Sequence, residues 1–187
     1  MRLIAIVRFR SVTEESLVRV CRELVDAGLP GVEVTLTTPF ALNAIEALGG
    51  RVGAGSVRTV EDARRAQEAG AAFLVTPVVR PEVLQAARVP VVCGALTPTE
   101  IDAAWVAGAA YVKVFPSPGP SYVRDVLAPL PEVPLVPTGG VRLESIVDYA
   151  AAGAAGVGVG SALVTEDLTE LRKRAKAFRR EAESAWH

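Results

Sequence analysis

The sequence predicts a single (β/α)8 TIM barrel with parallel strands, with residues 1–187 forming one domain. Short runs rich in β-branched residues recur eight times along the chain. Their starts fall roughly 20 residues apart, which leaves room for one strand, one short helix and two tight loops. A chain of 187 residues is long enough for one hydrophobic core and too short for two ordinary domains.

The eight predicted strands are each bounded by turns rich in Gly, Pro or Ala. They lie at Leu3–Val7, Val32–Leu36, Arg51–Ala54, Phe73–Thr76, Val89–Cys93, Ala110–Phe115, Leu135–Pro137 and Ala155–Val159. Eight parallel units favour a closed barrel, and no Gly-x-Gly-x-x-Gly motif follows the first run to indicate dinucleotide binding. One miscounted strand would instead give an open flavodoxin-like sheet, which is the alternative fold.

Helix-start signals lie between these runs. Three residue pairs have the spacing of a capping box, in which a hydroxyl and a carboxylate three residues later satisfy the first backbone amides of a helix. The pairs are Ser11 with Glu14, Thr59 with Asp62, and Thr97 with Glu100. Each follows a predicted strand, so helices are expected to alternate with strands. The charged run over residues 172–183 predicts a solvated last helix.

Composition excludes several classes of function. The 20 basic and 21 acidic residues give a net charge of −1, which leaves no cationic face for nucleic acid. No apolar stretch has the length of a membrane span, so a cytoplasmic protein without a membrane partner is expected. Cys21 and Cys93 lack metal-ligand spacing, and we interpret them as packing residues. His187 is the only histidine, so neither a catalytic triad nor a metal site is predicted, and no cofactor is expected.

Lys113 is the main candidate for catalysis. It is one of three lysines in a chain that has 17 arginines, and it lies within the apolar strand predicted at 110–115. An ammonium is costly to bury there unless a partner or a function compensates. Unlike a guanidinium, a lysine ammonium can lose a proton, and the resulting amine can form an imine. This predicts Schiff-base chemistry. The alternative is a lysine whose head reaches water from the strand end.

Glu33 is the candidate general acid-base. It is the only acid inside an apolar predicted strand, and burial makes a carboxyl easier to protonate. The alternative is a structural carboxylate that accepts backbone hydrogen bonds or pairs with an arginine. In an eight-stranded barrel, strands two and six supply side chains to the same interior layers. We therefore expect Glu33 to meet Lys113.

The remaining candidate residues bind substrate. Glycine-rich loops end strands seven and eight, where barrels usually bind phosphate through backbone amides. Arg8 ends strand one, where its guanidinium is suited either to a substrate carboxylate or to an ion pair with a helix acid. Hydroxyls and other small groups lie at the ends of further strands. The predicted binding residues are Arg8, Thr35, Ser56, Pro77, Thr138, Gly139, Gly140, Gly160 and Ser161.

Five motifs in order along the chain resemble one known family. They are Gly-Val-Glu-Val-Thr-Leu around Glu33, Gly-Ala-Gly-Ser-Val from Gly53, Val-Lys-Val-Phe-Pro around Lys113, Pro-Thr-Gly-Gly-Val from Pro137, and Gly-Ser from Gly160. The sequence resembles the 2-dehydro-3-deoxyphosphogluconate aldolase family over nearly its whole length. The resemblance implies a class I aldolase on a (β/α)8 barrel, usually a homotrimer and without a metal. Many members also cleave 4-hydroxy-2-oxoglutarate to pyruvate and glyoxylate.

The resemblance also implies roles for individual residues. It makes Lys113 the imine-forming lysine and Glu33 the proton shuttle. It makes Ser56 a carboxylate contact and Gly139, Gly140 and Ser161 a phosphate cradle.

One departure is Thr37, which stands where the phosphogluconate branch commonly has a carboxylate-binding arginine, a role that Arg8 is expected to take. The segments Leu-Ile-Ala-Ile-Val-Arg and Lys-Val-Phe-Pro-Ser resemble the phosphogalactonate branch. Thr138 resembles the phosphogluconate branch, where it is associated with stereochemical preference.

The predicted function is cleavage of 2-dehydro-3-deoxy-6-phosphogluconate to pyruvate and D-glyceraldehyde 3-phosphate, with 4-hydroxy-2-oxoglutarate as a further substrate. The partners are therefore a phosphorylated keto acid and pyruvate. Three alternatives stay open: 2-dehydro-3-deoxy-6-phosphogalactonate as substrate, a phosphate-binding barrel isomerase or cyclase in which Lys113 forms no imine, and a non-catalytic sugar-phosphate binder.

Overall fold

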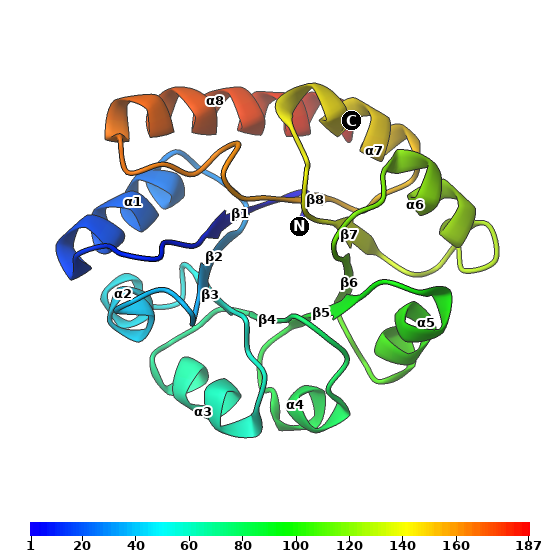
Figure 1. Cartoon of the computed structure of the whole chain (residues 1–187), viewed down its shortest axis with the longest axis horizontal. Coiled ribbons are helices and arrows are strands. Elements are labelled where there is room, and N and C mark those ends of the chain that lie inside the picture. The colour runs from blue at the N-terminus through cyan, green and yellow to red at the C-terminus, as the bar shows by residue number, and fades with distance from the viewer.

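The computed structural model describes residues 1–187 and has eight parallel strands arranged as a ring inside a layer of helices (Figure 1). The strands are β1 (Leu3–Val7), β2 (Val32–Thr35), β3 (Gly53–Gly55), β4 (Leu74–Thr76), β5 (Val91–Ala95), β6 (Tyr111–Val114), β7 (Leu135–Pro137) and β8 (Val157–Val159). Their order in the sheet is β7-β6-β5-β4-β3-β2-β1-β8.

The sheet is nearly closed on itself. Each strand from β1 to β7 pairs with the next, and β1 also pairs with β8. Between β7 and β8 a parallel bridge joins Thr138 to Gly158, and the Ala155 amide donates to the Leu135 carbonyl at 2.8 Å. The predicted (β/α)8 barrel is confirmed, and the open flavodoxin-like sheet is excluded by the β1–β8 pairing.

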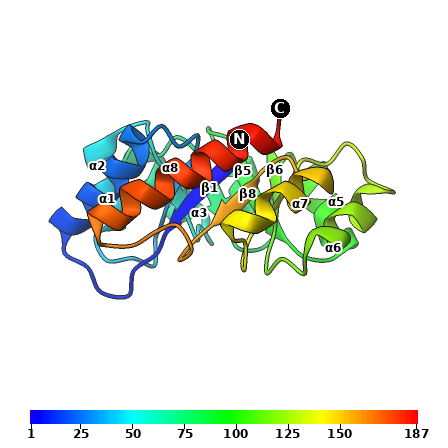
Figure 2. The same ribbon diagram turned by 90° about the horizontal axis from the view of Figure 1, so that it is seen from above.

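One helix follows each strand on the outside of the ring (Figure 1). The helices are α1 (Glu14–Asp26), α2 (Ala41–Leu48), α3 (Val60–Glu68), α4 (Pro81–Ala86), α5 (Pro98–Val106), α6 (Pro120–Leu127), α7 (Ile146–Ala151) and α8 (Leu168–Ala185), with a short 3-10 turn η1 (Leu143–Ser145) before α7. The last helix α8 contains the predicted charged run and contacts α1 and α7. Figure 2 shows it lying across the outside of β1 and β8.

Two of the three predicted capping boxes are confirmed. At the starts of α3 and α5, the hydroxyls of Thr59 and Thr97 and the carboxylates three residues later make both reciprocal hydrogen bonds. The prediction at Ser11 was wrong. Thr13, in extended conformation directly before α1, is the N-cap and accepts the Ser16 amide at 3.2 Å. The Thr13 hydroxyl directly precedes the first helical residue, so it can accept a hydrogen bond from the free amides of the first turn. Ser11 lies two residues further from the helix and is not the N-cap.

The core has two parts because side chains of a strand alternate between its faces. Inward-facing side chains form a small cluster that fills the barrel: Ile4, Ile6, Phe73, Val75, Val92 and Val136. Outward-facing side chains belong to a cluster of 48 buried residues that lies between the strands and the helices. This division leaves the carboxyl ends of the strands as the place where polar side chains enter the barrel.

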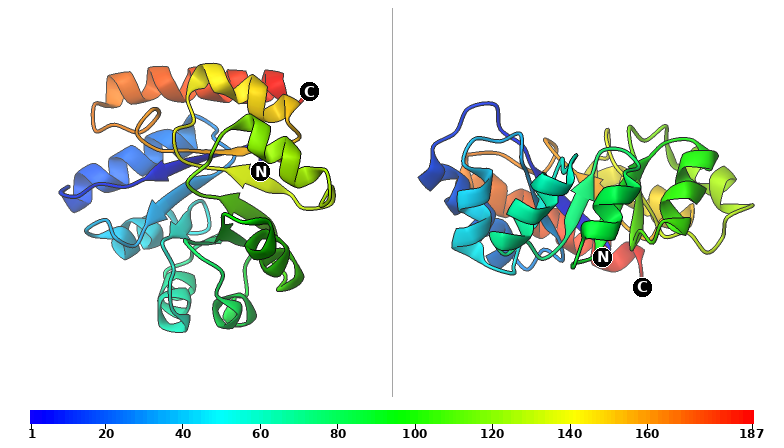
Figure 3. Two further views of the ribbon diagram at one scale, coloured as in Figure 1. Left: turned by 45° about the vertical axis from the view of Figure 1, so that its right-hand side comes forward. Right: turned by 90° about the horizontal axis from the view of Figure 1, so that it is seen from below.

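Both chain termini lie at the amino end of the barrel, away from the carboxyl ends of the strands (Figure 3). The terminal amine of Met1 donates to the Tyr111 hydroxyl at 2.8 Å, which attaches the start of the chain to β6. None of the helices combines the length and the apolar composition that a membrane span requires.

Candidate active site

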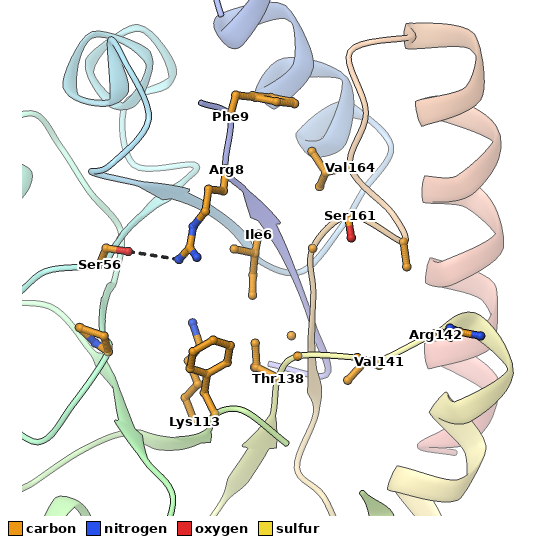
Figure 4. Close-up of a pocket in the computed structure, with 17 residues that line it drawn as sticks. Ile6, Arg8, Phe9, Ser56, Lys113, Thr138, Val141, Arg142, Ser161 and Val164 are labelled. Atoms are coloured by element: carbon orange, nitrogen blue, oxygen red, sulfur yellow. Dashed lines mark hydrogen bonds between the residues drawn. The ribbon is translucent and has the colours of Figure 1, made fainter. Parts of the chain in front are cut away.

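A cavity of about 680 Å³ opens at the carboxyl end of the barrel (Figure 4). Residues at the ends of β1, β3, β4, β6, β7 and β8 form its wall. Of the predicted site residues, the cavity is lined by Arg8, Ser56, Pro77, Lys113, Thr138, Gly139, Gly140, Gly160 and Ser161. Six separate strands thus bring together residues that lie up to 153 positions apart in the sequence.

Lys113 and Glu33 meet inside the barrel, as predicted. The neighbours of each along its strand, such as Val112 and Val34, face the outer core, so strand alternation turns both polar side chains inward. The Lys113 Nζ lies 3.6 Å from the Glu33 Oε2. Lys113 is 7% exposed and Glu33 is 1% exposed. Removal of either partner would leave an uncompensated buried charge, which is strongly unfavourable.

The second oxygen of the Glu33 carboxylate lies against the neighbouring strand β3. Glu33 Oε1 is fully buried and has no hydrogen-bond partner within the protein. Gly55 on the neighbouring strand makes room for it, since a Cβ at position 55 would lie 1.9 Å from this oxygen. A buried carboxylate oxygen without a partner is rare in folded proteins and indicates a place where a water or a ligand is accepted.

Arg8 and Ser56 form a polar pair at the mouth of the cavity. The Arg8 Nη2 donates to the Ser56 Oγ at 3.4 Å (Figure 4). None of the ion pairs in the structure includes Arg8, so the predicted alternative of an ion pair with a helix acid is wrong. Ser56 has a left-handed backbone with φ of 59°, which is uncommon for a residue with a side chain and frequent at functional sites.

Thr35 does not line the cavity, unlike the other predicted binding residues. It is completely buried, and its hydroxyl makes hydrogen bonds with those of Thr37 and Thr38, at 3.2 and 3.0 Å. The Thr38 hydroxyl also accepts the Phe9 amide at 3.3 Å. These hydroxyls join the end of β2 to the end of β1. Thr35 therefore supports the backbone beside Arg8.

Two loops at the ends of β7 and β8 line the cavity and contain backbone amides that make no hydrogen bond within the protein. Gly139 and Gly140 have left-handed backbones, with φ of 95° and 73°, which glycine adopts without strain. The Gly160 carbonyl accepts the amides of residues 163 and 164, which folds the second loop into one turn. The structure has no hydrogen bond from the backbone amides of Gly140, Val141, Gly160, Ser161 and Ala162. Backbone amides without a partner at a glycine-rich loop suit an anion.

Thr138 lies where these two loops meet the barrel interior. Its hydroxyl donates to the Val136 carbonyl at 3.3 Å. A Cβ at Gly158 would lie 2.3 Å from the Thr138 Oγ1. The absence of a side chain at Gly158 therefore allows the threonine to point inward. The hydroxyl is thus held at the wall of the cavity between the loops and Lys113 (Figure 4).

Sequence reasoning missed several cavity residues. They include Ile6, Phe115, Val141, Arg142 and Val164. The Phe115 ring centroid lies 5.6 Å from the Lys113 Nζ, a distance at which a ring attracts an ammonium group. Arg142 places a guanidinium at the rim beside α8 (Figure 4). Its position two residues after the glycine pair was the only signal available, because nothing in the sequence shows which way that loop turns.

Comparison with known proteins supports one family. The family model described as KDPG and KHG aldolase matches residues 1–179. The chain is 36% identical over 162 residues to the 2-dehydro-3-deoxy-phosphogluconate aldolase of Treponema pallidum, covering 81% of this chain and 76% of the relative. It is 34% identical over 190 residues to the 2-dehydro-3-deoxy-6-phosphogalactonate aldolase of Escherichia coli K12, covering 94% and 92%.

A solved structure described as native KDPGal is similar throughout, with a TM-score of 0.91 and 31% identity over 99% of this chain and 96% of that one. The similarity of fold and sequence therefore extends over nearly the whole chain. The chain belongs to the KDPG and KHG aldolase family, a family of aldehyde-lyases.

Proposed function

We propose that the chain is a class I aldolase that cleaves 2-dehydro-3-deoxy-6-phosphogluconate to pyruvate and D-glyceraldehyde 3-phosphate through an imine on Lys113. The observation that carries this proposal is the buried approach of the Lys113 Nζ to the Glu33 Oε2, 3.6 Å apart, at the base of a cavity with free amides at its other end. Family membership supplies the reaction class.

The first half of the reaction forms the imine. Transfer of a proton from the Lys113 ammonium to Glu33 gives a neutral amine, which attacks the C2 ketone of the substrate. Glu33 then returns its proton to the C2 hydroxyl of the carbinolamine, which leaves as water. The nitrogen lone pair forms the C=N bond, and the resulting iminium accepts electrons in the next step.

The second half breaks the C3–C4 bond. Glu33, acting through a water, removes the proton from the C4 hydroxyl, and the electron pair of the C3–C4 bond moves toward the iminium. Glyceraldehyde 3-phosphate leaves, and C3 of the remaining enamine takes up a proton. Addition of water to the iminium then releases pyruvate and restores the Lys113 amine. The free Glu33 Oε1, without a protein partner, suits the water that this step requires.

The two ends of the cavity suit the two charged ends of the substrate. The free amides of the loops after β7 and β8 suit the phosphate, and Arg142 adds positive charge at that rim. Arg8 and Ser56, on the other side of Lys113, suit the carboxylate. Binding both ends places the C2 ketone beside the lysine.

Thr138 supports the gluconate epimer as substrate. Its side chain lines the cavity, and a threonine at this position resembles the phosphogluconate branch of the family. The galactonate epimer is a second candidate, which the long alignment to the E. coli enzyme favours. Pyruvate release measured with each epimer, and with 4-hydroxy-2-oxoglutarate, decides between them. The gluconate epimer is expected to have the higher kcat/KM. A higher kcat/KM for the galactonate epimer would make that epimer the proposed substrate.

Borohydride reduction in the presence of pyruvate tests the imine. A class I aldolase acquires a stable pyruvate-derived adduct, which intact mass and peptide mapping are expected to locate on Lys113. A folded protein without an adduct would exclude the proposal and favour an isomerase or cyclase, in which Lys113 acts only through its charge.

We propose further that the chain forms a homotrimer in the cytoplasm. Two large exposed hydrophobic side chains, Phe40 and Val60, lie at the starts of the neighbouring helices α2 and α3, where a subunit contact would bury them. Light scattering is expected to give three times the chain mass of 19.6 kDa. A monomer mass would contradict the trimer, and fractionation of the source cells tests the location.

A further inference from the structure

The last helix contacts the loop after β8 from behind, through Arg174. The Arg174 Nη1 donates to the Ser161 carbonyl oxygen at 3.3 Å, and its Nε donates to the Glu170 Oε1 at 2.9 Å. The side chain is 34% exposed and does not line the cavity. Figure 4 shows the Ser161 loop between the cavity and α8. Arg174 therefore contacts this loop from α8, outside the lining of the cavity.

This contact fixes the direction of one peptide group. The peptide bond is planar and trans, so the Ser161 carbonyl and the Ala162 amide point in opposite directions. The carbonyl points to Arg174 on α8, and the amide consequently points away from α8. Ala162 lines the cavity, and its amide has no partner within the protein. The Ala162 N–H is thus presented to the cavity.

We propose that Arg174 is a positioning residue that orients the Ser161–Ala162 peptide group toward the substrate phosphate. This inference rests on the proposed function, which assigns a phosphate to that end of the cavity. The planar guanidinium has donors at fixed angles, so the Glu170 contact aims the second donor at the Ser161 carbonyl. An amide already directed at the phosphate needs no ordering when the ligand binds.

The expected effect is on binding and not on chemistry. Without Arg174, water replaces the guanidinium at the Ser161 carbonyl, and the peptide group gains freedom to rotate. The phosphate then loses a pre-oriented donor, whereas Lys113 and Glu33 on β6 and β2 keep their contact. A role limited to stability would instead change all activities of the protein together.

Arg179 on the same helix is a matched control. Its Nε donates to the Glu183 Oε1 at 2.9 Å, and its Nη1 donates to the Ala27 carbonyl at 2.9 Å. It therefore makes the same two kinds of contact as Arg174, one with a carboxylate four residues away and one with a backbone carbonyl. Ala27 directly follows α1, far from the loop after β8 in the sequence, and it does not line the cavity.

The test compares Arg174→Ala, Arg174→Lys and Arg179→Ala in steady-state kinetics with the phosphorylated substrate. Arg174→Ala is expected to raise KM, and the inhibition constant of inorganic phosphate, about five- to tenfold, the range of one hydrogen bond. It is expected to leave kcat within about twofold. Arg174→Lys, which keeps the positive charge and N–H donors but not the fixed geometry of the guanidinium, is expected to show a smaller increase in KM than Arg174→Ala. The rate of borohydride trapping with pyruvate, which has no phosphate, is expected to stay unchanged.

Equal values of KM for Arg174→Ala and Arg179→Ala would overturn the positioning role, as would an equal loss in pyruvate trapping. The two alanine variants are expected to have the same thermal unfolding midpoint. A difference in KM between them then reports on ligand binding and not on stability. Failure of the proposed function has a different signature, because the unsubstituted protein would then release no pyruvate from the phosphorylated substrate and form no adduct with pyruvate and borohydride.

Discussion

At the scale of the residue, Lys113 is the group on which the proposed chemistry depends. An arginine at this position keeps a positive charge but cannot lose its proton to form an imine. Lys113→Arg is expected to lower kcat by a factor on the order of 10³ or more, measured as pyruvate release. Lys173→Arg is the control, since that side chain is 81% exposed on α8. Substantial turnover by a folded Lys113→Arg variant would contradict the imine.

Glu33→Gln separates proton transfer from binding. Glutamine has the same shape but cannot shuttle a proton, so kcat is expected to fall about 10²- to 10⁴-fold. KM is expected to change little, because Glu33 does not line the cavity, whereas the residues proposed to bind the phosphate and the carboxylate do. An unchanged kcat would exclude Glu33 as the shuttle, and a change confined to KM would assign it to binding.

Gly55→Ala tests the space around the Glu33 carboxylate. The added Cβ would overlap Glu33 Oε1 at 1.9 Å, so the carboxylate must move. We expect kcat to fall while the fold is retained, since Glu33 is the flexible partner of this contact. Kinetics together with the unfolding midpoint distinguish this effect from general destabilisation. Unchanged kcat would mean that the carboxylate position is not important for turnover.

The sequence was sufficient to predict that Lys113 and Glu33 meet inside the barrel, because each is a charged residue in an apolar strand and strand alternation turns both side chains inward. It was not sufficient for Thr35, whose hydroxyl bonds with those of Thr37 and Thr38 and not with the cavity. It also missed Arg142. The direction of a loop depends on contacts that are distant in sequence, and no local pattern encodes them.

At the scale of the element, the capping box of α5 makes stability depend on pH. Backbone hydrogen bonds from Thr97 and Leu96 lower the pKa of Glu100 below its ordinary value of 4.5. A carboxyl with a lowered pKa in the folded state stabilises the protein above its unfolded pKa, and this contribution is lost as pH falls through the folded value. Glu100→Gln is therefore expected to lower the urea midpoint at pH 7.

The difference between this variant and the unsubstituted protein is expected to shrink as the pH falls below about 4.5. Glu46→Gln is the control for loss of a surface charge, because that exposed carboxylate makes no ion pair. A difference between Glu100→Gln and the unsubstituted protein that is the same at pH 7 and pH 3 would show that the charge of Glu100 does not stabilise the cap.

Element types were more predictable than element ends. The repeat of about 20 residues predicts alternating strands and helices, but the neighbouring strand decides where each strand stops. β3 is Gly53–Gly55, not 51–54, because it pairs with β2 from Glu33↔Gly53 to Thr35↔Gly55. The start of α2 was not predicted from the sequence. Its N-cap is Phe40, with a left-handed φ of 62° and no side-chain cap.

At the scale of the whole molecule, the nearly closed sheet joins the two ends of the chain. β1 lies between β2 and β8, so the first strand cannot leave without opening the barrel. The outer core of 48 residues is continuous around the ring. A barrel with a shared core and few independent edges is expected to unfold as one cooperative unit.

The two cysteines test this cooperativity because they lie in different parts of the barrel. Cys21 is in α1 and Cys93 is in β5, and both are free and buried. Burial raises the pKa of the Cys21 thiol to about 12 and raises that of Cys93 as well. Because the thiolate is the reactive form, neither is expected to react with a thiol reagent at pH 8 until the protein unfolds.

Peptide mapping after timed labelling in increasing urea gives a rate for each cysteine. If the barrel opens as one unit, the two rates are expected to be equal and to follow the denaturant dependence of global unfolding. Labelling of Cys93 much faster than Cys21 would mean that the β5 side of the ring opens separately. The site would then belong to two units of different stability, because Lys113 on β6 pairs with β5, whereas Glu33 on β2 pairs with β1.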